Sequence, residues 1–165
     1  MLELVAAVAL APWAQPVRFR PLAGWQTGHS ATMTSTYGPV PGVASPKESI
    51  AWMATGVRFG DRPGADPPTR TLARLPPRGI VVSVVIYESG TNSERPIELR
   101  LVRARRFPCC DGTYVAGGEY GLSGARLHHA YSVIVRVYFG SKPTRRMWTQ
   151  AQRALGRVEL PQPRS

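Results

Sequence analysis

Two adjacent cysteines and two adjacent histidines are the side chains best suited to nucleophilic or metal chemistry. Cys109 and Cys110 are the only cysteines of this 165-residue chain, and His128 and His129 follow them in the sequence. A zinc site needs ligands about two to four residues apart, and neither pair has that spacing. We therefore expect no metal and no other cofactor. A cysteine nucleophile needs a base and an electropositive setting, so a small enzyme that uses residues 109–119 with one of these histidines is our third hypothesis.

Three other catalytic patterns fail at their spacing. Residues 121–125, Gly-Leu-Ser-Gly-Ala, miss the Gly-x-Ser-x-Gly elbow of serine hydrolases by one position. Residues 112–118 have the glycine spacing of a phosphate-binding loop, but Glu119 stands where the lysine is required. The ten acidic residues are scattered singly, so no pair of carboxylates is placed for acid–base catalysis. The leading hypothesis is therefore a non-catalytic binding or accessory module that works through its sheet face or its loops.

Arginine dominates the charge of the chain. The formal net charge is +11, carried by 19 arginines and two lysines against ten acidic residues, and residues 94–165 hold +8 of it. Such a charge favours association with nucleic acid, an acidic protein or another anionic partner, which is our second hypothesis. A GC-rich coding bias, which raises Arg, Ala, Gly and Pro together, is the alternative explanation. The densest cluster, Arg103, Arg105 and Arg106, is a candidate anion-binding site, and the hypothesis also includes Arg136, Arg145, Arg146, Arg153 and Arg157.

Alternating apolar residues predict the sheet that must position these side chains. Residues 80–86, 97–102 and 127–139 place apolar side chains at every second position, which is typical of strands with one buried face. Turn residues between the first two runs predict a hairpin. The chain therefore predicts an α+β fold with a mostly antiparallel sheet of about five to seven strands. Further extended segments are expected at 17–20, 25–37 and 49–59, the last with a bulge at Gly56.

An amphipathic helix is predicted after the last strand. Thr144 or Ser141 can cap its start, and Gly156 is expected to end it, so that residues 158–160 extend again. Arginines fill one side of this helix, and we expect its apolar side to pack on one face of the sheet. A shorter helix is expected at 67–75, against the same sheet or at its end. The apolar side of the C-terminal helix is formed by Met147, Trp148, Ala151, Ala154 and Leu155, and Val158 continues the same spacing beyond Gly156.

The chain reads as an uncertain N-terminal segment, residues 1–16, followed by a single α+β domain at 17–161. Residues 4–11 form an apolar run like a short signal sequence, but Glu3 stands where a basic residue belongs, and a short packing helix is the alternative. This favours a cytoplasmic location slightly, with export as the alternative. No run approaches the roughly 18 apolar residues that a membrane-spanning helix needs, so we expect no integral membrane span.

The chain closes with Tyr138-Phe139-Gly140 and, further on, Ala151-Gln152-Arg153-Ala154-Leu155. This closing pattern resembles that of a conserved actinobacterial-type protein family of no known activity. The resemblance covers residues 17–161 and implies no catalytic role. More loosely, the order of elements is similar to that of PsbP-like α/β/α sandwiches. This second resemblance is architectural, and it implies no functional residues.

Overall fold

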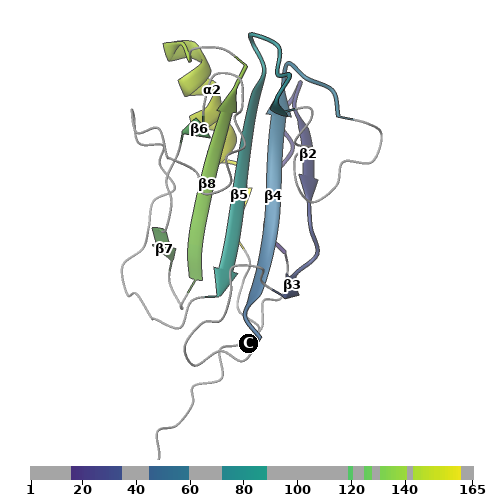
Figure 1. The fold of residues 1–165 in the computed structure, drawn as a ribbon, viewed down its shortest axis with the longest axis vertical. Helices are drawn as coiled ribbons and strands as arrows, with labels where there is room; N and C mark the ends of the chain where they lie inside the picture. The colour runs from purple at the N-terminus through teal and green to yellow at the C-terminus, as the bar shows by residue number, and fades with distance from the viewer. Residues whose placement is uncertain are drawn as a thin grey trace, which may run out of the picture.

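A seven-stranded antiparallel sheet organises the chain (Figure 1). The structure is a computed structural model that describes residues 16–34, 45–59, 72–88, 119–120, 125–127, 131–140 and 143–160. The hydrogen-bonded order is β2-β4-β5-β8-β6, while β3 also pairs with β4 and β7 also pairs with β8. The strands are β2 (Gln26–His29), β3 (Met33–Thr34), β4 (Lys47–Thr55), β5 (Ile80–Glu88), β6 (Glu119–Tyr120), β7 (Ala125–Leu127) and β8 (Tyr131–Phe139). The fold is α+β, as the sequence predicts.

The three central strands form most of the core. Residues 80–86 read Ile-Val-Val-Ser-Val-Val-Ile, and β-branched side chains of this kind favour extended backbone. Every one of these residues is buried, and so are residues 48–54 of β4. The expectation of a sheet buried on one face is therefore wrong for β4 and β5, which are buried on both faces. The near-continuous apolar run of β5 is the pattern of such a doubly covered strand.

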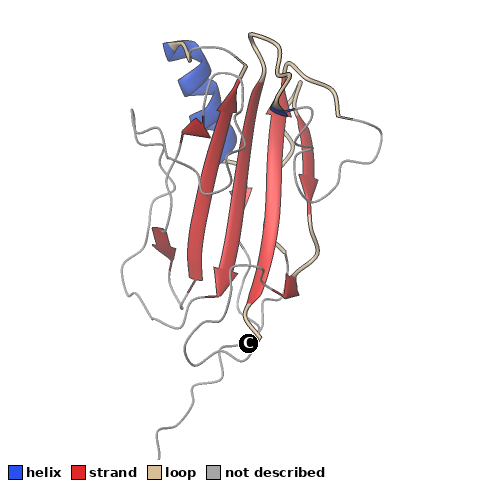
Figure 2. Ribbon diagram, in the orientation of Figure 1, coloured by secondary structure: helices blue, strands red, loops and turns tan. Residues whose placement is uncertain are grey.

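The C-terminal helix packs on one face of the sheet, as predicted (Figure 2). Helix α2 (Arg145–Leu155) begins at Thr144, whose side chain accepts a hydrogen bond of 3.2 Å from the backbone N–H of Met147, and it ends at Gly156. Its apolar side is buried, and the half-buried Trp148 lies 5.3 Å from the ring of Phe139. The side chains of this shared core are Met147, Ala151, Ala154 and Leu155 of α2, with Ala51, Met53, Ile80, Val82, Val84, Ile86, Val133, Val135, Val137 and Phe139 of the sheet.

A two-stranded ribbon extends the helix layer on the same face. β1 (Arg18–Phe19) pairs antiparallel with β9 (Val158–Glu159), which follows α2 directly. Val17 and Phe19 belong to the core beneath α2. The backbone N–H of Val17 donates a hydrogen bond of 2.9 Å to the buried hydroxyl of Ser49 on β4. The chain therefore closes one layer over the sheet with segments from both of its ends.

A smaller apolar cluster covers part of the opposite face. Trp52 of β4 is fully buried there and meets the ring of Phe59 at 4.5 Å, nearly edge to face. Leu72 and Leu75 join the cluster from residues 72–75, the part of the expected helix at 67–75 that the structure describes. Gly28 of β2 lies directly opposite Trp52, and a Cβ added there would approach the indole to 2.6 Å. The glycine is therefore required by the close approach of the tryptophan ring.

Several strand boundaries differ from the expected ones. β4 ends at Thr55, because Gly56 has a φ of +73° and so leaves the extended conformation instead of forming a bulge. The segment at 127–139 contains two strands, since β7 folds back on β8 with Leu127 opposite Tyr131. Alternating apolar residues show where a strand is possible, but they do not show where the chain reverses.

The central position of β5 also corrects the predicted hairpin. β5 pairs with β4 along residues 80–87 and with β8 along its whole length. Both of its edges are therefore occupied, and the expected hairpin partner at 97–102 has no edge of β5 to join. That segment itself lies outside the described residues. The error arose because neighbouring apolar runs were expected to pair, whereas β5 pairs with strands distant in the sequence.

Candidate anion-binding surface

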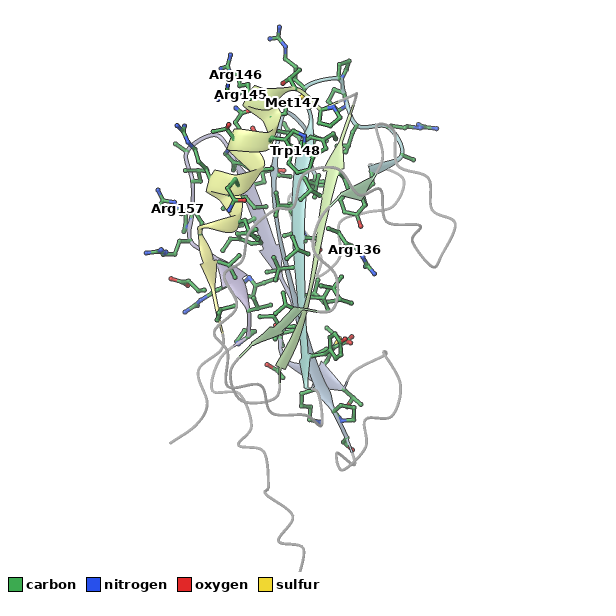
Figure 3. All side chains as sticks on the ribbon, turned by 90° about the vertical axis from the view of Figure 1, so that its left-hand side faces the viewer. Arg136, Arg145, Arg146, Met147, Trp148 and Arg157 are labelled. Atoms are coloured by element: carbon green, nitrogen blue, oxygen red, sulfur yellow. The ribbon has the colours of Figure 1, made fainter. Side chains whose placement is uncertain are left out.

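The outward side of α2 carries a row of arginines. Arg145, Arg146, Arg153 and Arg157 are all exposed, while the opposite side of the helix is buried in the core. Figure 3 shows Arg145, Arg146 and Arg157 projecting away from the sheet. Successive residues of a helix turn by about 100°, so Arg145, Arg146 and Arg153 fall on the outward side of α2, away from its buried residues. Arg157 lies in the turn that follows Gly156. The positive charges therefore line the outward side of α2 and the turn after it.

The row continues onto β1. Arg18 and Arg20 are exposed, and the backbone N–H of Arg20 donates a hydrogen bond of 2.8 Å to the backbone oxygen of Arg157. The carboxylate of Glu159 lies 2.9 Å from Arg18 Nε and 4.0 Å from Arg20 Nε. We call the six arginines of α2, the turn that follows it and β1 the arginine surface; they are Arg18, Arg20, Arg145, Arg146, Arg153 and Arg157.

Little negative charge offsets the arginine surface. Of the acidic side chains whose surroundings the structure describes, Glu48 is buried on β4 and Glu159 lies at the edge of the surface. Within the described residues, no carboxylate forms an ion pair with the four arginines that follow Thr144. The first turn of α2 holds no acidic residue, so its two arginines stand unopposed at the positive end of the helix dipole. Such an arrangement suits an anion supplied from outside the chain.

Arg136 does not belong to this surface. It lies on β8 in register with Ser83 of β5, and both side chains stand on the face opposite α2. Figure 3 shows Arg136 projecting on the other side of the sheet from Arg145 and Arg157. The idea that all eight arginines act together is therefore wrong for Arg136. β8 alternates its side chains between the two faces, and an even-numbered position falls away from the helix.

The other predicted site residues lie outside the described residues. These are the candidate anion-binding cluster Arg103, Arg105 and Arg106 and the candidate loop site Cys109, Cys110, His128 and His129. Glu119, the last residue of the 109–119 segment, is placed at the start of β6 opposite Tyr138. Within the described part of the chain, no group of three His, Cys, Asp or Glu side chains is arranged to hold a metal ion.

Sequence reasoning missed the contribution of Arg18 and Arg20. Both lie near the N-terminal end of the domain, far in sequence from α2. They join the surface because β1 pairs with β9, and a pair of two-residue strands leaves almost no pattern in the sequence. The available signal was the alternation of apolar and charged residues over 17–20. It puts Val17 and Phe19 on a buried side and Arg18 and Arg20 on an exposed side.

Comparisons with protein-family models, with curated proteins and with solved structures found no match for this chain. No helix of the described residues combines the length and the apolar character needed to cross a membrane.

Proposed function

We propose that this protein is a non-catalytic binding module that recognises an anionic partner through the arginine surface. The observation that carries the proposal is the row of exposed arginines on α2, which no carboxylate of the described residues neutralises. Guanidinium groups bind phosphate and carboxylate oxygens through two parallel hydrogen bonds, so several of them in a row give both affinity and orientation. The layer beneath is rigid, because the buried side of α2 is part of the core.

The proposal is tested by titrating the protein with inorganic polyphosphate at low salt. The variant Arg145→Gln/Arg153→Gln/Arg157→Gln removes three positive charges from the arginine surface. Exposed ionic contacts are worth about 0.5–1 kcal/mol each, so we expect the affinity to fall by about ten- to a hundredfold.

The matched control is Arg58→Gln/Arg74→Gln/Arg78→Gln. These three arginines are also exposed, but they come from residues 57–59 and 72–79, which cover the opposite face or the end of the sheet. This variant loses the same charge and is expected to bind polyphosphate nearly as well as the natural protein. Equal losses in the two variants would show that net charge alone attracts the anion, and the proposal would be wrong.

A further inference from the structure

The side chains in and around the arginine surface indicate which class of anionic partner can bind there. The apolar side of α2 cannot enter a lipid bilayer, because Met147, Ala151 and Leu155 are buried against the sheet. Among the described residues, Leu160 is the large hydrophobic side chain that is exposed. Peripheral membrane helices bind by inserting an apolar side at the headgroup boundary, so this helix lacks what such binding needs.

A protein partner also fits the surface poorly. Stable protein interfaces are centred on buried aromatic or aliphatic side chains, with charged residues mainly at the rim. The outward side of α2 instead presents arginines with Gly156 and two threonines. The hydroxyl of Thr144 caps the helix, and that of Thr149 donates to the backbone oxygen of Arg145. Arginine side chains are among the groups that proteins use to contact nucleic-acid phosphates, and interfaces with nucleic acid are polar and strongly positive.

Among the described residues, the aromatic side chains near the arginine surface are not placed to stack on bases. Trp25 and Trp148 are half-buried and pack against the core beneath α2. Proteins that bind single strands combine a basic groove with exposed aromatic rings on which the bases stack. A rigid row of cations without such rings suits the phosphates of a duplex, which stand on the outside of the helix at a rise of about 3.4 Å per strand.

We infer that the arginine surface binds the phosphate backbone of a nucleic-acid duplex and does not read its sequence. This inference rests on the proposed function and names the partner class. The helix from Arg145 to Arg153 covers about 12 Å, enough to face about three or four phosphates of one strand. Arg157 and Arg20 extend the contact beyond the end of α2, since their backbones are hydrogen-bonded.

The test measures the anisotropy of labelled 20-base-pair duplexes of DNA and of RNA, each in two unrelated sequences, across a range of salt concentrations. We expect log affinity to fall with log salt at a slope of about −3 to −4, as for four phosphate contacts. Each single change, Arg145→Gln or Arg153→Gln, is expected to reduce the slope by about one. Arg58→Gln is expected to leave the slope unchanged. Glu159→Gln, which removes the carboxylate beside Arg18, is expected to tighten binding.

Four competitors separate the possible outcomes: single-stranded DNA, polyglutamate, vesicles of phosphatidylcholine with phosphatidylserine, and polyphosphate. Tighter binding to polyglutamate, vesicles or single strands than to either duplex would overturn this inference and leave an anionic partner in place. Binding to none of these polyanions would overturn the proposed function as well. A difference above about tenfold between the two sequences would show base readout and would contradict the inference, since one mismatched pair costs about that much in specific complexes. The duplex that binds more tightly identifies whether the natural partner is DNA or RNA.

Discussion

The change Arg145→Glu is expected to stabilise the protein while weakening its binding to polyanions. Arg145 stands in the first turn of α2, where the helix dipole repels a cation and no acidic residue offsets it. Reversing the charge removes one repulsion and adds one attraction, each worth about 0.3–1 kcal/mol at low ionic strength, so the gain is about 1 kcal/mol. For a domain of this size, that corresponds to a rise in Tm of about 2–4 °C.

Arg153→Glu is the matched control. It changes the net charge by the same amount and also removes one arginine from the surface. However, Arg153 lies in the last turn of α2, where the dipole attracts a cation. Glutamate there is expected to lower the Tm by a similar amount, about 2–4 °C. Both variants reduce the overall positive charge equally, so the difference between them isolates the effect of position on the helix.

Thermal unfolding at low and at moderate salt, with polyphosphate titrations of the same samples, measures both effects. The difference in Tm between the two variants should shrink as salt rises, because screening weakens the interaction between charge and dipole. Both variants should bind polyphosphate more weakly than the natural protein. A lower Tm for Arg145→Glu would mean that this arginine stabilises the fold through its own contacts. The argument that it is kept for binding would then be refuted.

Four further changes test the packing of the sheet and of α2. Gly28→Ala should destabilise the protein by about 1–3 kcal/mol in urea unfolding, since the new Cβ would overlap the buried Trp52 indole. Its control is Gly156→Ala, where a Cβ would have ordinary contact distances, and this change should leave the stability unchanged or slightly higher. Val135→Asp buries a charge in the core, so we expect no cooperative unfolding transition by circular dichroism, and a natural-like melt would contradict the core described above. Trp148→Ala should cost about 2–3 kcal/mol, below the value for a fully buried tryptophan because this ring is half-buried.

The sequence predicted the elements better than their partners. The period of apolar residues identified β5, β8 and α2. The capping residues predicted the end of α2 at Gly156 and left its start open between Ser141 and Thr144, of which the structure shows Thr144. Which strands pair was harder to predict, because the hydrogen bonds between strands are made by backbone groups that every residue carries. The hairpin expected between β5 and residues 97–102 shows this: these residues follow β5 most closely among the apolar runs, yet the edge of β5 is occupied by β8.

The candidate surface was predictable in part. The arginines of α2 were expected to share one side, since spacing along a helix fixes the side on which a residue stands. Arg136 could have been separated from them, because the apolar residues of β8 stand at odd positions and Arg136 at an even one, on the opposite face. The structure shows that α2 covers the face of the odd positions, where Val133, Val135 and Val137 meet Ala151 and Leu155. Arg18 and Arg20 were not predictable members of the surface, because they reach it through the pairing of β1 with β9, two strands far apart in the sequence.

The energetics of α2 explain how its outer side can carry charges that disfavour the helix. Burying a leucine such as Leu155 contributes about 1.5–3 kcal/mol, and Met147 contributes a similar amount. The two arginines of the first turn together cost about 0.6–2 kcal/mol at low salt. Packing therefore outweighs the unfavourable charges, and the N-cap hydrogen bond of Thr144 adds to it. Since folding does not require arginine at these positions, a residue of another type would serve the helix better there. Stability therefore does not explain why arginine occupies these positions, whereas the proposed binding to an anion does.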